Sequence, residues 1–258
     1  MSEDMKIADY LAQGGVLTSP DNAPPRYRAE LLRMMASFVD SELAGAAGFA
    51  DVINQGPGVK ERIAAARIVM EKTNHADLVL RLMGEFGTNT DKYANQHPWT
   101  KRLARNAPVD AKRSDLDMRL AVFNYPLEGW IDAVVMNFLM GKAVGVQLAE
   151  YATISYQPLA EVIRKIIPRE AHHAELAAEG LAKLRDDSEQ DAKISGSIAY
   201  WWPRVVSSFG NGSSKRFDSL RSMGLRKFTN AELRNRWNHV ATETLDNLNI
   251  AIPQTEQN

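Results

Sequence analysis

EKTNH at residues 71–75 and REAHH at residues 169–173 are the two stretches that decide the predicted fold. In the first, a lysine and a histidine stand three residues apart, and in the second a glutamate and a histidine do so. Side chains three apart on a helix lie on one face, so each pair projects toward one point. A carboxylate and an imidazole held together in this way are ligands of transition metals. The stretches therefore predict two helices that meet at a polar site, with a lysine in place of one carboxylate.

Two further acids complete an ordered set along the chain. Glu42 lies 33 residues before His75, within a segment predicted as a helix, and Asp132 lies 41 residues before His173, near the start of another. Ferritin-like four-helix bundles carry a two-metal carboxylate site in this order, with an acid on two helices and a Glu-x-x-His unit on each of the others. The order predicts an all-α, ferritin-like four-helix bundle. The metal ligands that it predicts are Glu42, His75, Asp132, Glu170 and His173.

Each of these residues also has an ordinary structural explanation. Glu42 can be a surface acid, and Asp132 can be an acid at a helix N-terminus, where the helix dipole favours a negative charge. His173 can be exposed to solvent. Taken singly, each residue favours the ordinary explanation, and only the combined spacing favours a metal site.

Composition limits the functions open to the chain. Its 258 residues carry a formal net charge of -1, which gives no electrostatic reason to expect nucleic acid or an anionic membrane as a partner. The apolar stretch at residues 133–146 contains Asn137 and Lys142, and residues 1–10 are polar, so the sequence predicts a cytoplasmic protein without a membrane span. The chain has no cysteine, which excludes disulfides, thiolate metal sites and cysteine nucleophiles. Any metal is therefore held by nitrogen and oxygen.

Apolar residues recur at helical spacing in nearly every long segment, and alternating strand patterns are absent. Breakers such as GPG at residues 56–58 separate the segments. We expect a single domain with a flexible start over residues 1–25, a long connection over residues 91–118 that crosses the bundle, and a tail over residues 250–258. The predicted helices span residues 27–53, 59–87, 127–151, 158–184, 192–209 and 230–249, the last two being additional C-terminal helices.

Several longer blocks carry a specific resemblance between about residues 25 and 250. They are rich in aromatic residues, so chance is a poor explanation for them. They comprise Tyr27-Arg28 with Leu32-Arg33 before Ser41-Glu42, Phe123-Asn124-Tyr125-Pro126 with Trp130-Ile131-Asp132, Ser155-Tyr156-x-Pro158, Trp201-Trp202-Pro203, Phe209-Gly210, and Lys227-Phe228-Thr229-Asn230-x-Glu232-Leu233-Arg234. In these blocks the chain resembles the large catalytic subunit of ring-1,2-phenylacetyl-CoA epoxidase.

The resemblance implies a fold, an activity and partners. Members of that family are ferritin-like di-iron proteins that work with a metal-free sister subunit, take electrons from a reductase and insert one oxygen atom from O2 into a CoA-bound aromatic ring. The implied cofactor is iron, two ions or one, and the implied substrate is an aromatic or other acyl-CoA thioester. Carried over by position, the family's ligands fall on Glu42, Lys72, His75, Asp132, Glu170 and His173.

The chain departs from the family pattern at four places. Lys72 stands where the family has an iron-bridging glutamate, and Arg169 stands where it has an acid beside Glu170. Met118 and Arg119 replace a Lys-Tyr pair. The chain stops soon after residue 253, where family members continue with an arm that helps to hold the partner protein. Metal content, partner choice and CoA binding are the properties that these departures affect.

Lys72 allows three interpretations. In the first, its ammonium lies among the carboxylates and replaces the charge of the metal, since buried carboxylates need a cation. In the second, one metal remains beside Glu170, His173 and Asp132, and Lys72 replaces the other ion or donates a proton during oxygen chemistry. In the third, a π-bulge in the helix turns Glu71 toward the metal, since such bulges are frequent at functional sites.

Two classes of function therefore compete. An oxygenase is favoured by the five ligand positions that the chain retains. A metal-free scaffold or partner subunit is favoured by Lys72, because a cation about 4 Å from a metal opposes metal binding by several kcal/mol even at an effective dielectric near 20. A general helical interaction module, with all these acids on its surface, is disfavoured by the long family blocks.

Basic residues in the last third of the chain are candidate contacts for the phosphates of CoA. An ordinary solvated charge cluster is the alternative explanation for each of them. The candidates are Lys215, Arg216, Arg226 and Lys227.

Overall fold

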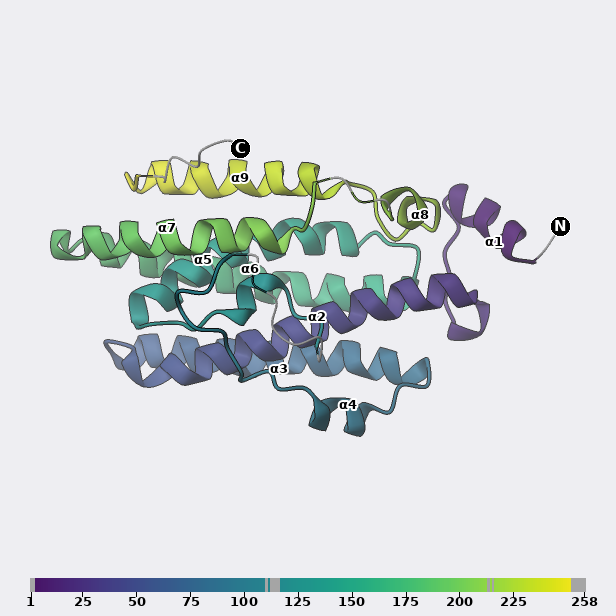
Figure 1. Cartoon of the computed structure of the whole chain (residues 1–258), viewed down its shortest axis with the longest axis horizontal. Helices are drawn as coiled ribbons and strands as arrows, with labels where there is room; N and C mark the ends of the chain where they lie inside the picture. Colours follow the sequence, from purple (N-terminus) through teal and green to yellow (C-terminus); the bar gives the residue numbers. More distant parts are fainter. Residues whose placement is uncertain (1–2, 110, 112–116, 213, 215, 252–258) are drawn as a thin grey trace.

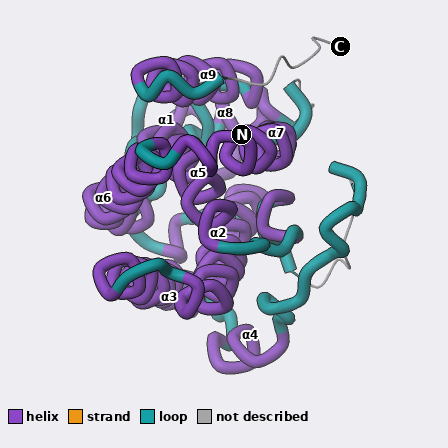
Figure 2. Tube along the Cα trace, turned by 90° about the vertical axis from the view of Figure 1, so that its left-hand side faces the viewer, coloured by secondary structure: helices purple, strands orange, loops and turns teal. Residues whose placement is uncertain are grey.

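The structure, a computed structural model, describes residues 3–109, 111, 117–212, 214 and 216–251. This part of the chain contains no β-strand, so the all-α prediction is confirmed. Four long helices form the bundle, and two more lie against one side of it (Figures 1 and 2). The four are α2 (Pro25–Val52), α3 (Val59–Glu85), α5 (Trp130–Tyr151) and α6 (Gln157–Arg185).

The bundle consists of two helical hairpins. The 3-10 turn η2 (Ile53–Gln55) and Gly56-Pro57-Gly58 join α2 to α3, and a short turn joins α5 to α6. Such short connections return the chain antiparallel to itself. The proline at the start of α2 suits this place, because its missing N–H is one that the first turn of a helix leaves unpaired anyway.

Helices α7 (Asp191–Ser208) and α9 (Asn230–Asn247) cover α5 on the side away from α2 and α3 (Figure 2). Thr229 and Glu232 form a capping box that starts α9. Trp237 of α9 is fully buried, and its indole N–H donates to the Leu139 carbonyl at 2.9 Å. The predicted additional C-terminal helices are therefore confirmed, and they bury the apolar surface that α5 turns away from α2 and α3.

Two short helices differ from the expectation. Residues 3–12, predicted as part of a flexible start, form α1 (Glu3–Ala12), and its Leu11 is buried against the bundle. α8 (Phe217–Ser222) was not predicted. Each is too short to show a sustained helical period in sequence. The predicted tail falls almost entirely outside the described residues.

The long connection between the hairpins contains α4 (Thr90–Gln96) and a 3-10 turn, η3 (Ala121–Asn124). Asp40 of α2, which is fully buried, anchors it by accepting from Tyr93 Oη at 2.8 Å and from the Met118 backbone N–H at 2.6 Å. Arg119 is also buried and donates to Asp117 at 2.6 Å and to several backbone carbonyls of residues 98–101. Both positions that depart from the family pattern before Phe-Asn-Tyr-Pro therefore help to hold the connection against α2.

One helix of the bundle is apolar and long enough to cross a membrane. α5 has a mean hydropathy of 1.3 over its most apolar 18-residue window. However, 67% of that window is buried inside the bundle, as expected for a central core helix.

Close contact between α5 and α6 depends on Gly141. A Cβ atom placed there meets Ala174 Cβ at 3.0 Å and Ala174 Cα at 3.2 Å. We expect Gly141→Ala to lower the free energy of unfolding by about 1–3 kcal/mol, because the helices must separate. The matched control is Gly145→Ala in the same helix, where a Cβ meets nothing within 4 Å. That change should instead stabilise the protein by about 0.5–1 kcal/mol, and urea unfolding measures both. Equal effects of the two substitutions would contradict this account of the packing.

Candidate functional site

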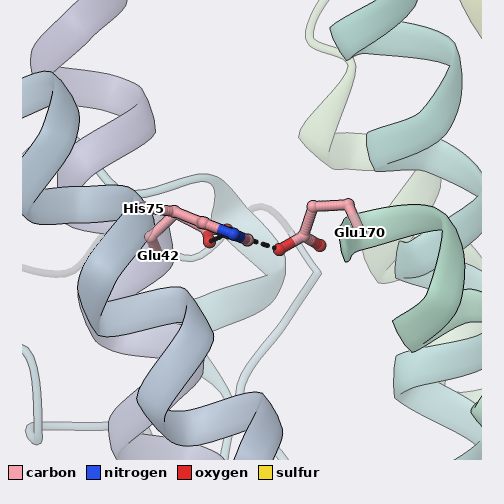
Figure 3. Close-up of side chains that lie close together, drawn as sticks. All are labelled: Glu42, His75 and Glu170. Carbon is pink, nitrogen blue, oxygen red and sulfur yellow. Dashed lines mark hydrogen bonds and ion pairs between the residues drawn. The ribbon is translucent and has the colours of Figure 1, made fainter. Parts of the chain in front are cut away.

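Three buried side chains from three helices meet at the centre of the bundle. Glu42 lies in the middle of α2, His75 in α3 and Glu170 in α6, and none is more than 3% exposed. One ligand atom from each lies within 4.8 Å of the other two, a spacing that can hold a metal ion. Figure 3 shows the three side chains pointing toward one another across the space between the helices.

Lys72 reaches into the same place from α3. Its Nζ atom donates to Glu42 Oε1 at 3.1 Å and to Glu170 Oε2 at 3.0 Å, and the side chain is almost completely buried. Burial opposes its positive charge, but the carboxylates of Glu170 and Glu42 outweigh this effect and raise the pKa of Lys72 above its ordinary value. Burial likewise opposes the charge on Glu170, but Lys72 and the two histidines hold its pKa well below the usual range. An ammonium ion and two carboxylates therefore share one desolvated site.

His75 supplies a second positive charge. Its Nδ1–H donates to Glu170 Oε1 at 3.0 Å and, at 3.3 Å, to Glu42 Oε2. Burial opposes protonation, yet these hydrogen bonds prevail and raise the pKa of His75 to about 9. At neutral pH two cations then balance two carboxylates without any metal.

His173 lies beside this group and is fully buried. Its Nε2 atom is 2.6 Å from Glu71 Oε2, so that nitrogen donates to Glu71. Its Nδ1 atom points back toward the cluster, 3.3 Å from Glu170 Oε1, and has no hydrogen bond with a described residue. The exposed guanidinium of Arg169 approaches Glu71 from the surface, at 3.9 Å.

Glu71 reaches His173 without a π-bulge. α3 is a regular α-helix from Val59 to Glu85. The third interpretation of Lys72, in which a π-bulge turns Glu71 toward the metal, is therefore corrected. Consecutive residues are about 100° apart around a helix. Lys72 therefore points to the centre of the cluster, whereas Glu71 points to one side of it and contacts Nε2 of His173.

Asp132 is not brought to the cluster, so the prediction that it is a metal ligand is corrected. It is the third residue of α5, and one carboxylate oxygen accepts from Ser197 Oγ at 2.6 Å. The other accepts from the Glu128 backbone N–H at 3.0 Å and from Arg105. Both oxygens are thus occupied at the helix N-terminus, which is the ordinary explanation for an acid at that position.

No carboxylate of α5 takes its place. α5 runs antiparallel to α2, and Met140 lines the same cavity as Glu42, so Met140 marks the level of Glu42 on α5. The next residue, Gly141, packs against Ala174. One turn earlier, Asn137 donates from Nδ2 to the His173 carbonyl at 3.2 Å. The α5 residues that contact α6 beside His173 are therefore a glycine and an amide.

Two of the four basic candidates for CoA contacts line a cavity of about 240 Å³. Arg216 pairs with Glu30 there, and Arg226 lies 2.9 Å from the buried Glu150. Lys227 gives only its backbone N–H to Glu150 and does not line the cavity. The fourth candidate, Lys215, lies outside the described residues. Sequence reasoning missed Arg33, an exposed residue of α2 that also lines this cavity.

A smaller cavity of about 50 Å³ lies beside this one. Its lining includes Glu42 and Met140, and it shares Ser37 and Tyr151 with the arginine-lined cavity. The two cavities therefore adjoin each other at Ser37 and Tyr151, and the smaller one reaches Glu42 of the buried cluster. A polar molecule with an apolar end suits such a pair of adjoining cavities.

Comparison with known proteins shows the family of the chain. The model of the family described as "Phenylacetic acid catabolic protein" matches residues 5–258. A relative in Escherichia coli (strain K12), one of the subunits of 1,2-phenylacetyl-CoA epoxidase, is 26% identical over 263 residues, an alignment that covers 99% of this chain and 79% of the relative. The chain belongs to the phenylacetic acid catabolic protein family.

Proposed function

We propose that this chain is a subunit of a multicomponent oxygenase of the phenylacetyl-CoA epoxidase type that binds an acyl-CoA thioester but does not itself activate oxygen. The observation that carries the proposal is the position of Lys72 Nζ, 3.1 Å from Glu42 and 3.0 Å from Glu170. An ammonium ion there supplies the positive charge that a metal supplies in an oxygen-activating site.

The residues present do not fit a two-iron centre. Such a centre takes an acid from each of two helices and a Glu-x-x-His unit from each of the other two. Here α3 offers Lys72 in place of the glutamate, and α5 offers Gly141 where its acid is needed. A charged lysine about 4 Å from a metal site costs about 4 kcal/mol per unit of metal charge at an effective dielectric of 20. Loss of two carboxylates and gain of one cation both oppose iron.

The ligand side of the proposal rests on the arginine-lined cavity. Arginine binds phosphate by paired hydrogen bonds, so Arg33, Arg216 and Arg226 suit the phosphates of CoA. The smaller, apolar cavity that adjoins it at Ser37 and Tyr151 then receives the acyl group. Because the relative is named as one component of an epoxidase, we propose that the partner of this chain is a sister subunit, and that a reductase serves the complex.

A second candidate, an oxygenase with a single metal ion, is favoured by one observation. His173 Nδ1 is buried, points toward Glu170 and has no hydrogen bond with a described residue, as expected of a nitrogen that binds a metal. The ion would lie among Glu42, His75 and Glu170, and Lys72 would have to leave them. About one iron per chain would support this candidate.

Two measurements test the proposal: the binding of a CoA thioester and the consumption of O2. We expect phenylacetyl-CoA to bind the purified protein in calorimetry, and we expect no O2 uptake above the buffer rate after Fe(II) loading and addition of a chemical reductant. Arg33→Ala should weaken binding about tenfold, the loss of one charge-assisted hydrogen bond. The control is Arg81→Ala, since Arg81 is exposed on α3 and pairs only with Asp77 among the described residues. O2 uptake that depends on phenylacetyl-CoA would overturn the proposal.

A further inference from the structure

A second, more apolar cavity of about 460 Å³ opens at the end of the bundle where α3 begins and α6 ends. It lies between α3, α5 and α6 and is separate from the arginine-lined cavity, with which it shares no lining residue. Its volume falls in the range of small-molecule sites, about 300–1,000 Å³. Neither the buried cluster of Glu42, His75 and Glu170 nor the proposed CoA site explains why the bundle contains this second cavity.

Small residues create the space. Each of the three neighbouring helices lines the cavity partly with alanine or glycine, where longer apolar side chains would fill a bundle core. Larger apolar residues, Phe49, Ile68 and Trp130, close the sides. The small wall residues are Ala64, Ala65, Ala133, Ala177 and Gly180.

The inner end of the cavity carries one polar group. Asn137 is 7% exposed and lines the cavity. Because its Nδ2 atom donates to the His173 carbonyl, the orientation of the amide is set and Oδ1 is left as an acceptor. No described residue donates to that oxygen. Because Oδ1 is not among the fully buried atoms that lack a partner, it is open to the cavity, where an acceptor suits a donor group on a bound molecule.

The mouth carries charges of both signs. Lys60 and Lys183 line it, together with Glu61 and Glu179. Lys183 Nζ forms an ion pair with Glu61 at 3.7 Å, which balances part of its charge. Lys60 is exposed at the first turn of α3 and forms no ion pair with a described residue. Among the described residues, the mouth thus offers one ammonium group without an ion pair, Lys60, and one carboxylate without an ion pair, Glu179, beside an apolar interior.

We propose that this cavity binds an amphipathic monocarboxylic acid, a medium-chain fatty acid or an arylalkanoic acid, with its carboxylate at Lys60 and its apolar body inside. Lys60 and Ile68 are about 12 Å apart along α3, a span that a chain of about ten carbon atoms fills. A hydroxyl group at the far end of the chain donates to Asn137 Oδ1. The bound acid lies one helical turn from the cluster, because Ile68 precedes Lys72 by four residues.

Calorimetry with decanoate, 10-hydroxydecanoate, 4-phenylbutyrate and neutral decanol tests the proposal on the full chain. Saturable binding of one acid per chain is expected, with 10-hydroxydecanoate tighter than decanoate and decanol at least tenfold weaker. The two simple acids distinguish an alkyl ligand from an aryl one. No saturable binding of any acid, or binding of decanol as tight as that of decanoate, would overturn the proposal.

Matched variants locate the site. Ala64→Phe fills the cavity and should weaken binding at least tenfold, whereas Ala66→Phe, on the exposed side of the same helix, should have no effect. Lys60→Glu should also weaken binding at least tenfold, and the exposed Arg67→Glu should not. Unchanged binding in a folded Ala64→Phe protein would place the acid elsewhere and overturn the assignment. The test needs neither metal nor turnover, so its failure leaves the proposed function untouched.

Discussion

Replacement of Lys72 by glutamate is expected to raise the iron content of the protein from near zero to about one ion per chain after loading with Fe(II) without oxygen. The substitution removes the ammonium group that lies 3.1 Å from Glu42 and 3.0 Å from Glu170 and adds a carboxylate at the same place. Three carboxylates and two histidines then face one another. A second ion is not expected, because α5 presents Gly141 where the fourth carboxylate is needed.

The iron content of Lys72→Glu is measured by elemental analysis beside a matched control. Lys165→Glu makes the same change of charge on an exposed residue of α6 and should leave iron near zero. Circular dichroism checks that both proteins are folded. A folded Lys72→Glu protein that gains no iron would contradict the position assigned to this side chain.

Lys72→Met is expected to lower the free energy of unfolding by about 3–5 kcal/mol in buffer that contains a chelator. Methionine keeps the length of the side chain but removes its charge, so Glu42 and Glu170 remain buried with too little positive charge around them. Breaking a buried ion pair on one side costs this much because the other charge stays desolvated. The chelator ensures that no metal takes the place of the ammonium group.

Chemical denaturation of three proteins tests this result. Lys165→Met, on the surface of α6, should change the free energy of unfolding by less than about 0.5 kcal/mol. Adding Glu170→Gln to Lys72→Met should recover part of the loss, because one of the two unbalanced carboxylates is removed. A loss below about 1 kcal/mol for Lys72→Met would show that Lys72 does not neutralise the buried carboxylates.

Sequence predicted the long helices well because their signals are redundant. In α3, apolar residues at helical spacing extend over many turns, and the Gly-Pro-Gly breaker marks its beginning. α1 and α8 lack this redundancy, since a helix of one to three turns contains too few apolar positions to define a period. Their packing against the bundle stabilises them, and sequence does not display that packing.

Sequence predicted the site residues correctly only where a residue lies near the middle of its predicted helix. Glu42, His75, Glu170 and His173 lie near the middle of their helices, so sequence spacing placed them at one level. Asp132 lies at the start of α5, about two helical turns along the bundle from the level of the other four residues. Its 41-residue distance from His173, against 33 for Glu42 and His75, is the signal that could have excluded it.

The role of Lys72 could not be decided from sequence. A lysine in a ligand position is compatible with an empty site, a single metal or a shifted register, and only side-chain contacts distinguish these arrangements. The contacts of Lys72 with Glu42 and Glu170 are those that the first interpretation requires. Glu71 could not be placed either, because its contact with His173 depends on how closely α3 and α6 approach each other.

Elemental analysis of the native protein after loading with Fe(II) without oxygen tests the central claim most directly. Iron, manganese, zinc and copper are measured on folded protein freed of loosely bound ions. If Lys72 replaces the charge of the metal, each element should be near zero per chain. One or two tightly bound ions per chain would contradict the account, and bound iron would favour the chain as the oxygen-activating component.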